Sequence, residues 1–239
     1  MAAEFKEIEM TGHTPESSAR IYAKVAGLAY VIIIMLGIFS VNYVESSLVE
    51  PENIAATVNN ISTNEWLFRI GVASEVLMYA LVVLLSLALY VILKPVNRNL
   101  ALLALLWRLG EAIIGGATTV LSGIIPLLLI KRGAAFEPEQ VKILAGLFLA
   151  VRGAGLDVVL IFIGMGGTLF CYLFFRSKFV PRILAAWGIL TYLTMLILAF
   201  VSILNPDISE TVKLAFYAPG GLFELIFGLW LFFKGIQVQ

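Results

Sequence analysis

The stretch WLFRIGVASEVLMYALVVLLSLALYVIL, residues 66–93, is an apolar run of 28 residues with two charged side chains, Arg69 and Glu75. An α-helix rises about 1.5 Å per residue, so about 20 residues cross the roughly 30 Å hydrocarbon core of a bilayer. Because the run exceeds that length and is almost wholly apolar, it predicts a transmembrane helix.

Five further runs of this kind occur in the chain, at residues 21–44, 99–130, 141–175, 181–204 and 212–233. Of the 239 residues, 61% are hydrophobic and 13% are charged. That charged share is about half of the value usual for soluble proteins. We therefore predict an all-α fold, a six-helix transmembrane bundle over residues 20–239, preceded by a retained polar cytoplasmic tail at residues 1–19.

The composition excludes several classes of protein. Cys171 is the single cysteine and His13 the single histidine, so the chain can form no internal disulfide and no Cys- or His-ligated metal centre. A bis-His haem and a Ser/His hydrolase are excluded for the same reason. The formal net charge is zero, which gives no reason to expect a nucleic acid. We predict no cofactor.

The distribution of basic residues predicts the orientation, because cytoplasmic loops carry an excess of Lys and Arg. The side that holds the N-terminus has nine: Lys6, Arg20, Lys24, Lys94, Arg98, Arg176, Lys178, Arg182 and Lys234. The other side has four: Lys131, Arg132, Lys142 and Lys213. Both termini are therefore predicted to be cytoplasmic.

The runs 99–130 and 141–175 are longer than one crossing of the bilayer requires. Three explanations stay open: the helices tilt strongly, they break, or their hairpin projects from the membrane. Gly115, Gly116 and Pro126 are candidate break points in the first run, and Gly153 and Gly155 in the second.

Two pairs of runs, 66–93 with 99–130 and 141–175 with 181–204, suggest a weak internal repeat. An acidic residue precedes a tyrosine by 15 positions and a basic residue by 19 in both pairs: Glu75, Tyr90 and Lys94, and Asp157, Tyr172 and Arg176. Both hairpins run in the same direction, so this would be a parallel repeat.

Charged residues within the predicted spans are the candidate ligand-binding groups, because such residues usually face the bundle interior or an aqueous cavity. They are Glu75, Arg108, Glu111, Arg152, Asp157 and Glu224. Arg69 and Arg152 are set apart, because at 100° per residue each is rotated away from the acid that follows it on its own helix, Glu75 or Asp157. They are expected to find acids on other helices or to lie among the headgroups.

Glu224 is the strongest of these candidates. It lies ten residues before Lys234, about 15 Å deep and near the midplane, as does Arg108. The other charges lie further from the cytoplasm, which predicts a vestibule that opens outward. The spans hold four acids and three arginines, so one carboxyl group should be protonated, hydrated or matched by a bound cation. Pro219 nearby predicts a bend.

Several fragments of the chain resemble a known family: ARIYAKVAGLAYVIIIMLGIF at residues 19–39, PVNRNLALLALLWRL at 95–109, YLFFRSKFVPRIL at 172–184 and FELIFGLWLFFKG at 223–235. They are similar to the bacterial membrane family called domain of unknown function 4386, over about residues 19–235. The resemblance implies a six-helix, multi-pass protein of the bacterial inner membrane. It implies no activity.

Three functions remain open at this point. The first is a site in the outer half of the bundle for a small molecule, a proton or another cation, used in transport. The second is a structural or accessory subunit, alone or as a homo-oligomer, whose buried ion pairs only fix helix packing. The third is an intramembrane enzyme that uses Glu75, Asp157 or Glu224 as an acid or base. An enzyme is the less favoured reading.

The orientation can be tested with reporter fusions. A reporter fused after Gln239 should be active on the cytoplasmic side, and one inserted within residues 46–64 on the opposite side, because the basic residues gather at one end of the spans. Activity of both fusions on the same side would contradict the predicted number of crossings.

Overall fold

All regular elements of the protein are helices in the residues that the computed structural model describes, which are 15–50, 53–133, 136–205 and 207–237. The all-α prediction is therefore confirmed. In chain order the elements are α1 (Pro15–Phe39), η1 (Ser40–Glu45), α2 (Ser46–Leu48), α3 (Ile54–Thr63), α4 (Glu65–Leu93), α5 (Arg98–Thr119), η2 (Val120–Ile124), α6 (Ile125–Arg132), α7 (Pro138–Ser177), α8 (Arg182–Leu204) and α9 (Glu210–Phe233). Residues 1–14 of the predicted tail lie outside the described residues, and residues 15–19 belong to α1.

Six helical segments of the described chain are long and apolar enough to cross a membrane. They are Ser18–Leu48, Glu65–Leu93, Arg98–Arg132, Pro138–Ser177, Arg182–Leu204 and Thr211–Phe233. Each contains most of one predicted run. Large apolar side chains on these segments are exposed on the bundle surface, among them Met35, Ile113, Leu147 and Ile197. Lipid can cover such a surface, and the protein is a multi-pass membrane protein.

Local signals fix where the spanning helices begin. The Asn97 side chain accepts a hydrogen bond of 3.0 Å from the backbone of Leu100 and caps α5. Ser209 caps α9 in the same way. Glu137 and Gln140 form a reciprocal capping box at the start of α7. These side chains satisfy backbone N–H groups that have no partner inside the helix.

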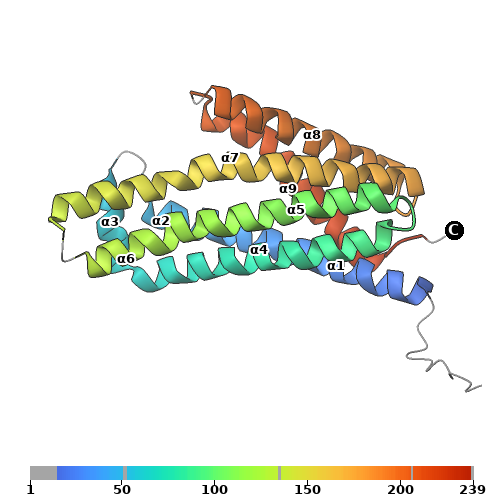
Figure 1. The fold of residues 1–239 in the computed structure, drawn as a ribbon, viewed down its shortest axis with the longest axis horizontal. Coiled ribbons are helices and arrows are strands. Elements are labelled where there is room, and N and C mark those ends of the chain that lie inside the picture. Colours follow the sequence, from blue (N-terminus) through green and yellow to red (C-terminus); the bar gives the residue numbers. More distant parts are fainter. Residues whose placement is uncertain (1–14, 51–52, 134–135, 206, 238–239) are drawn as a thin grey trace, which may run out of the picture.

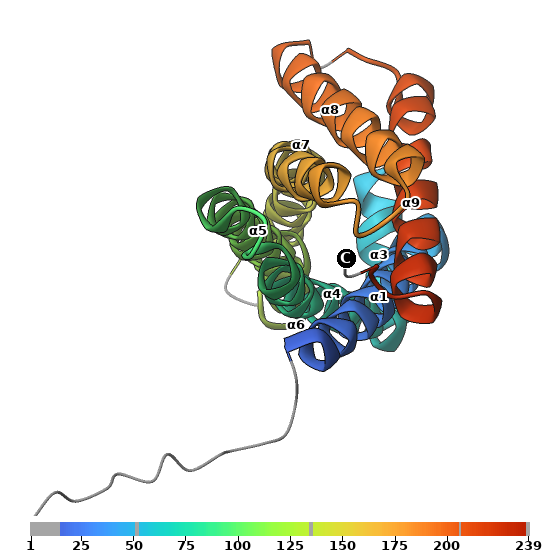
Figure 2. The ribbon, with the colours of Figure 1, turned by 90° about the vertical axis from the view of Figure 1, so that its right-hand side faces the viewer.

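The six spanning segments form a closed ring in chain order. Each of α1, α4, α5, α7, α8 and α9 packs against its neighbours in the sequence, and α9 packs against α1. Figure 2 shows these helices around a common axis. Both α1 and α9 have their terminal ends on one side, which we call the termini end; the opposite side, with α3 and α6, is the far end (Figure 1).

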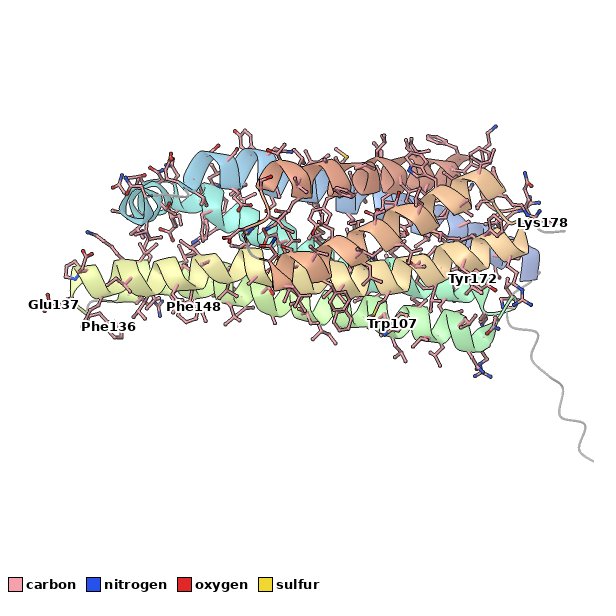
Figure 3. The ribbon with its side chains drawn as sticks, turned by 90° about the horizontal axis from the view of Figure 1, so that it is seen from above. Trp107, Phe136, Glu137, Phe148, Tyr172 and Lys178 are labelled. Carbon is pink, nitrogen blue, oxygen red and sulfur yellow. The ribbon has the colours of Figure 1, made fainter. Side chains whose placement is uncertain are left out.

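Two of the segments extend well beyond the others, as their length predicted. The α7 helix has 40 residues and is about 60 Å long, and the segment Arg98–Arg132 has 35 residues. Glu137 and Lys178 lie at opposite ends of the molecule in Figure 3. At the far end α7 and α6 pack against α3, past the ends of α8 and α9 (Figure 1). The hairpin therefore extends past the ends of α8 and α9 within the bundle, and its position relative to the membrane stays a prediction.

The predicted break points are wrong for α7 and displaced for the other segment. The α7 helix runs through Gly153 and Gly155 without interruption. The segment Arg98–Arg132 instead widens into the π-helix η2, between Gly116 and Pro126. A glycine permits a break but does not force one where neighbouring helices hold the backbone. The α9 helix is continuous through Pro219, and the bend predicted there stays a prediction.

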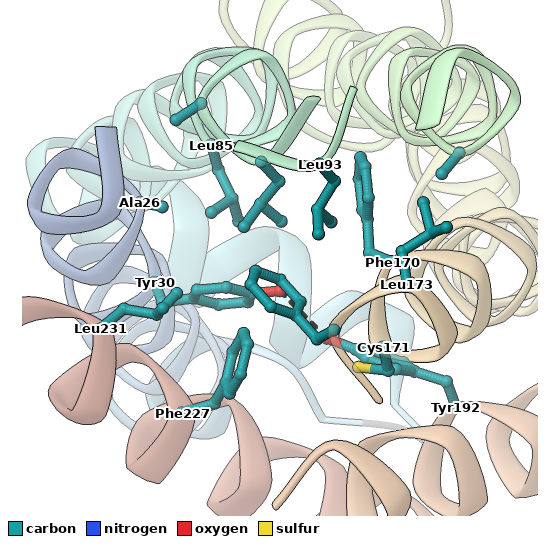
Figure 4. Close-up of a cluster of buried hydrophobic side chains, with 14 of the residues drawn as sticks. Ala26, Tyr30, Leu85, Leu93, Phe170, Cys171, Leu173, Tyr192, Phe227 and Leu231 are labelled. Atoms are coloured by element: carbon teal, nitrogen blue, oxygen red, sulfur yellow. Dashed lines mark hydrogen bonds between the residues drawn. The ribbon is translucent and has the colours of Figure 1, made fainter. Parts of the chain in front are cut away.

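A cluster of apolar and aromatic side chains fills the ring at the termini end. Figure 4 shows Tyr30, Phe170, Tyr192 and Phe227 among its members, and each is at most 3% exposed. Residues 236–237 cover this cluster at the termini end. Ile236 is buried, and the Gln237 backbone N–H donates a 2.9 Å hydrogen bond to the carbonyl of Phe179. The bundle interior is therefore sealed at this end.

The contact that closes the ring is a crossing of α1 and α9 at two glycines. A methyl group added to Gly27 would lie 2.5 Å from the Gly228 carbonyl oxygen and from the Phe232 backbone nitrogen. Residues without a side chain let membrane helices approach to backbone contact. Gly37 and Gly221, nearer the far end of the same helices, have far more space: a methyl on Gly221 would meet nothing within 4 Å.

This crossing generates a stability prediction. Gly27→Ala should lower the free energy of unfolding by about 1–3 kcal/mol, because the added methyl overlaps backbone that cannot rotate away. Gly116→Ala is the matched control, since a methyl there meets nothing within 4 Å. Thermal unfolding in detergent measures both. An equal midpoint for the two variants would mean that the crossing is not tight.

Candidate functional site

The six candidate charged residues form three groups in the bundle. Glu75 pairs with Arg152, and Arg108 pairs with Glu111 beside a cavity that Glu224 also lines. Asp157 is separate from both groups. Glu75, Arg108 and Glu111 are buried, and the other three are partly buried. None of the six is fully exposed, as expected for charges inside a membrane.

Arg152 joins three helical elements near the far end. Its guanidinium forms an ion pair with Glu75 of α4 and another, of 3.2 Å, with Glu45 of η1. Ser40 donates a 2.6 Å hydrogen bond to the Glu75 carboxylate, and Thr119 donates one of 3.1 Å. The Glu75 carboxylate therefore has donors at both oxygens, as a buried charge requires.

The two π-helical segments of the described chain flank this network. Ser40 begins η1 and Glu45 ends it, while Thr119 immediately precedes η2. A π-turn inserts a residue into a helix and re-aims its side chains, and it often occurs at functional sites. Here both turns bring polar groups toward Glu75. A small cavity of about 110 Å³ adjoins Ser40, Glu75 and Arg152.

Arg108 and Glu111 form an ion pair one turn apart on α5. Their atoms Nη1 and Oε2 are 2.7 Å apart, and both side chains are at most 4% exposed. A spacing of three residues places both side chains on one face of the helix. It gives α5 a neutral polar patch that faces the ring interior.

A cavity of about 500 Å³ lies beside this pair, in the middle of the bundle. Its walls are mainly apolar and come from α1, α4, α5, α7 and α9, with Ile34, Gly37, Tyr79, Leu156, Ile163, Gly221 and Leu222 among the lining residues. Leu222 and Leu156 are about half exposed, so the cavity is open. It occupies the space between α1 and α9 on the far-end side of the Gly27–Gly228 crossing, where the two helices separate.

Glu224 lines this cavity from α9. The Tyr192 hydroxyl of α8 donates a 2.7 Å hydrogen bond to its carboxylate. The Tyr30 hydroxyl lies 3.4 Å from that of Tyr192 and can donate to it in turn (Figure 4). Within the described chain no Lys or Arg forms an ion pair with Glu224. The carboxyl group is thus held by the Tyr192 hydroxyl and faces a largely apolar space.

Asp157 and Arg69 lie outside both clusters. Asp157 accepts a 2.8 Å hydrogen bond from Ser202 of α8. The expectation that Arg69 finds no acid on its own helix is wrong, because it pairs with Glu65 one turn earlier at 2.7 Å. Glu65 directly precedes the apolar run 66–93, so the spacing of charges within the run does not reveal this pair.

Sequence reasoning missed the uncharged and boundary partners of the charged residues. Ser40, Thr119, Tyr192 and Ser202 are hydroxyl residues within apolar runs, and Glu45 follows the first run directly. Hydroxyl groups are common in membrane helices and carry no charge to mark them. The signal that could have found them is their depth in the membrane, because a tyrosine or serine at the same depth as a buried acid is a candidate hydrogen-bond partner.

Comparison with models of protein families matches residues 25–235 to the family described as "Domain of unknown function (DUF4386)". The chain belongs to this family. The resemblance seen in the sequence fragments is thereby confirmed over nearly the whole chain. The comparison with curated proteins found no match, and neither did the comparison with solved structures. The family description carries no activity, so any function has to come from the geometry of the site.

The network around Arg152 generates a prediction for a double-mutant cycle. Arg152→Gln should lower the free energy of unfolding by about 1–3 kcal/mol, because it leaves the Glu75 charge buried without a cation. The double variant with Glu75→Gln should recover part of that loss, since neither charge then remains. The measurement is thermal or chemical unfolding in lipid-free detergent.

The exposed pair of Glu65 and Arg69 is the control for this cycle. Arg69→Gln should cost at most about 1 kcal/mol, because an exposed ion pair contributes little. Additive losses in the Glu75 and Arg152 cycle would show that the two side chains are not coupled.

Proposed function

We propose that the protein binds a small organic molecule with an apolar body and a cationic group in the cavity beside Arg108, Glu111 and Glu224, and carries it across the membrane. The observation that carries this proposal is Glu224 itself. Its carboxyl group lines a mainly apolar cavity and has a hydroxyl group, not a cation, as its partner. A cationic ligand would supply the missing charge.

The cavity has the size and chemistry that such a ligand needs. Small-molecule sites usually measure about 300–1,000 Å³ and combine apolar walls with a few polar groups. Arg108 and Glu111 neutralise each other, so Glu224 leaves the lining with one negative charge in excess. The Tyr79 ring also lines the cavity and can face a bound cation.

Access from one side of the bundle supports transport. The cavity is open where α1 and α9 separate, whereas the aromatic cluster and the chain end close the termini end. We propose a location in the bacterial inner membrane with both termini in the cytoplasm, supported by the nine-to-four distribution of basic residues. Transport then requires a further opening of the bundle interior toward the termini end.

A packing role is proposed for Glu75 and Arg152. The supporting observation is that their network is paired on every side, with Ser40, Thr119 and Glu45 as further partners. A satisfied network of this kind fixes the register of α1, α4 and α7 at the far end. We therefore assign ligand binding to Glu224, Arg108 and Glu111, and helix positioning to Glu75 and Arg152.

The proposal predicts charge-selective binding. Tetraphenylphosphonium and tetraphenylborate have the same shape and opposite charges, so their comparison isolates the electrostatic contribution. The purified protein should bind the cation at least tenfold more tightly than the anion, because one carboxyl group is in excess. Equilibrium dialysis measures both affinities, and flux of the cation into proteoliposomes tests transport.

Two variants sharpen this test. Glu224→Gln should remove the tenfold preference, equivalent to about 1.4 kcal/mol, while it keeps the hydrogen bond to Tyr192. Gly221→Leu should block both ions by filling the cavity, since a side chain there meets open space. Asp157→Asn is the control, as this acid lies outside the cavity and should not affect binding. Equal affinities for the two ions in the parent protein would contradict the proposal.

A further inference from the structure

A second cleft lies on the outer surface of the bundle, between α4 and the segment formed by η2 and α6. Its volume is about 530 Å³. Three basic residues, Arg69, Lys131 and Arg132, lie at its rim, and its remaining lining residues are apolar: Val72, Ala73, Val76, Ile124, Leu127 and Leu128. It shares no lining residue with the central cavity.

Both walls of this cleft change from basic to apolar residues in the same direction, from the far end inward. On α4 the lining runs from Arg69 at the far end to Val76, about 10 Å further in. On the opposite wall it runs from Arg132 to Ile124, about 12 Å further in. A basic rim therefore leads into an apolar slot of matched depth on both walls.

The basic residues at the rim are held in place and exceed the nearby acid. Glu65 forms ion pairs with Arg69 at 2.7 Å and with Lys131 at 2.5 Å. Among the described residues Arg132 has no ion-pair partner, and it is exposed. Three basic side chains and one acid leave two positive charges in excess at the rim.

The depth of the rim matches the headgroup layer of a bilayer. Arg69 lies 25 residues before Lys94, about 37 Å along α4 from the termini end. The hydrocarbon core is about 30 Å thick, and the headgroup layers extend it to about 40–45 Å. Arg69 is thus at the level of lipid phosphates, and Val76 on the same wall of the slot is at the level of acyl chains.

We propose that this cleft is a binding site for one anionic phospholipid. The phosphate and its negative headgroup lie against Arg69, Lys131 and Arg132, and one acyl chain occupies the slot between Val76 and Ile124. Basic pockets between membrane helices bind anionic headgroups in this way. A zwitterionic lipid would leave the charge in excess unmatched, and a free phosphate would leave the slot unfilled.

The test is lipid retention measured by native mass spectrometry. The full chain in detergent is given equal amounts of phosphatidylglycerol and phosphatidylcholine with identical acyl chains. We expect one retained phosphatidylglycerol per chain and a higher unfolding temperature with phosphatidylglycerol alone. Equal retention of the two lipids would overturn the proposal. So would full competition by glycerol phosphate, which has the headgroup chemistry without acyl chains.

Three variants separate the parts of the site. Arg132→Gln should reduce retention at least fivefold by lowering the charge at the rim. Ala73→Trp should reduce it as much by filling the slot, at an exposed position where a large side chain is tolerated. Lys142→Gln is the control, because Lys142 is a far-end basic residue outside the cleft.

Each variant is also unfolded in lipid-free detergent, so that a folding defect is not taken for lost binding. If Lys142→Gln lowers retention as much as Arg132→Gln does, the effect is general surface charge and the site is refuted. If Ala73→Trp folds and retains the lipid fully, the acyl chain does not use the slot and the site is likewise refuted.

Discussion

The approach of α1 and α9 at Gly27 and Gly228 is the constraint on which the rest of the structure depends. It brings the first and last spanning helices into backbone contact and so closes the ring of six. Lipid tails are as apolar as leucine, so close packing, and not exclusion of water, drives this association. Because the contact lies near the termini end, the two helices are free to separate further along, where the central cavity forms.

The charged residues divide according to the partners that the ring gives them. Where η1 brings Ser40 and Glu45 toward α4 and α7, Arg152 finds two carboxylates, and the network is complete. On α9 no basic residue lies between Lys213 and Lys234, and the Glu224 carboxylate is left with the Tyr192 hydroxyl as its partner. Packing and electrostatics are thus linked, because the glycine-rich helix that closes the ring also carries the uncompensated acid.

The sequence predicted the features that follow from length and local spacing. Six apolar runs are enough to place six helices, and a separation of three residues is enough to pair Arg108 with Glu111. The sequence did not predict which residues of different helices meet, because the rotation of each helix about its axis depends on its neighbours. The sequence indicated that Arg152 needs an acid on another helix, but not that this acid is Glu75, 77 positions away. The π-turns were also invisible, since no residue pattern near Ser40 or Val120 demands one.

The two suggested repeat hairpins share a contact that the sequence did not reveal. In the first, Glu75 of α4 accepts a hydrogen bond from Thr119 of α5, 44 positions later. In the second, Asp157 of α7 accepts one from Ser202 of α8, 45 positions later. Each hairpin therefore holds an acid against a hydroxyl group near the end of its second helix. Among the described residues, only the first of these acids pairs with an arginine, Arg152, which comes from the second hairpin. Superposition of the two hairpins tests whether they descend from one ancestor, in which case Glu75 should lie over Asp157. In that case Arg152 makes the two hairpins unequal, because it pairs with the acid of the first hairpin and not with the acid of its own.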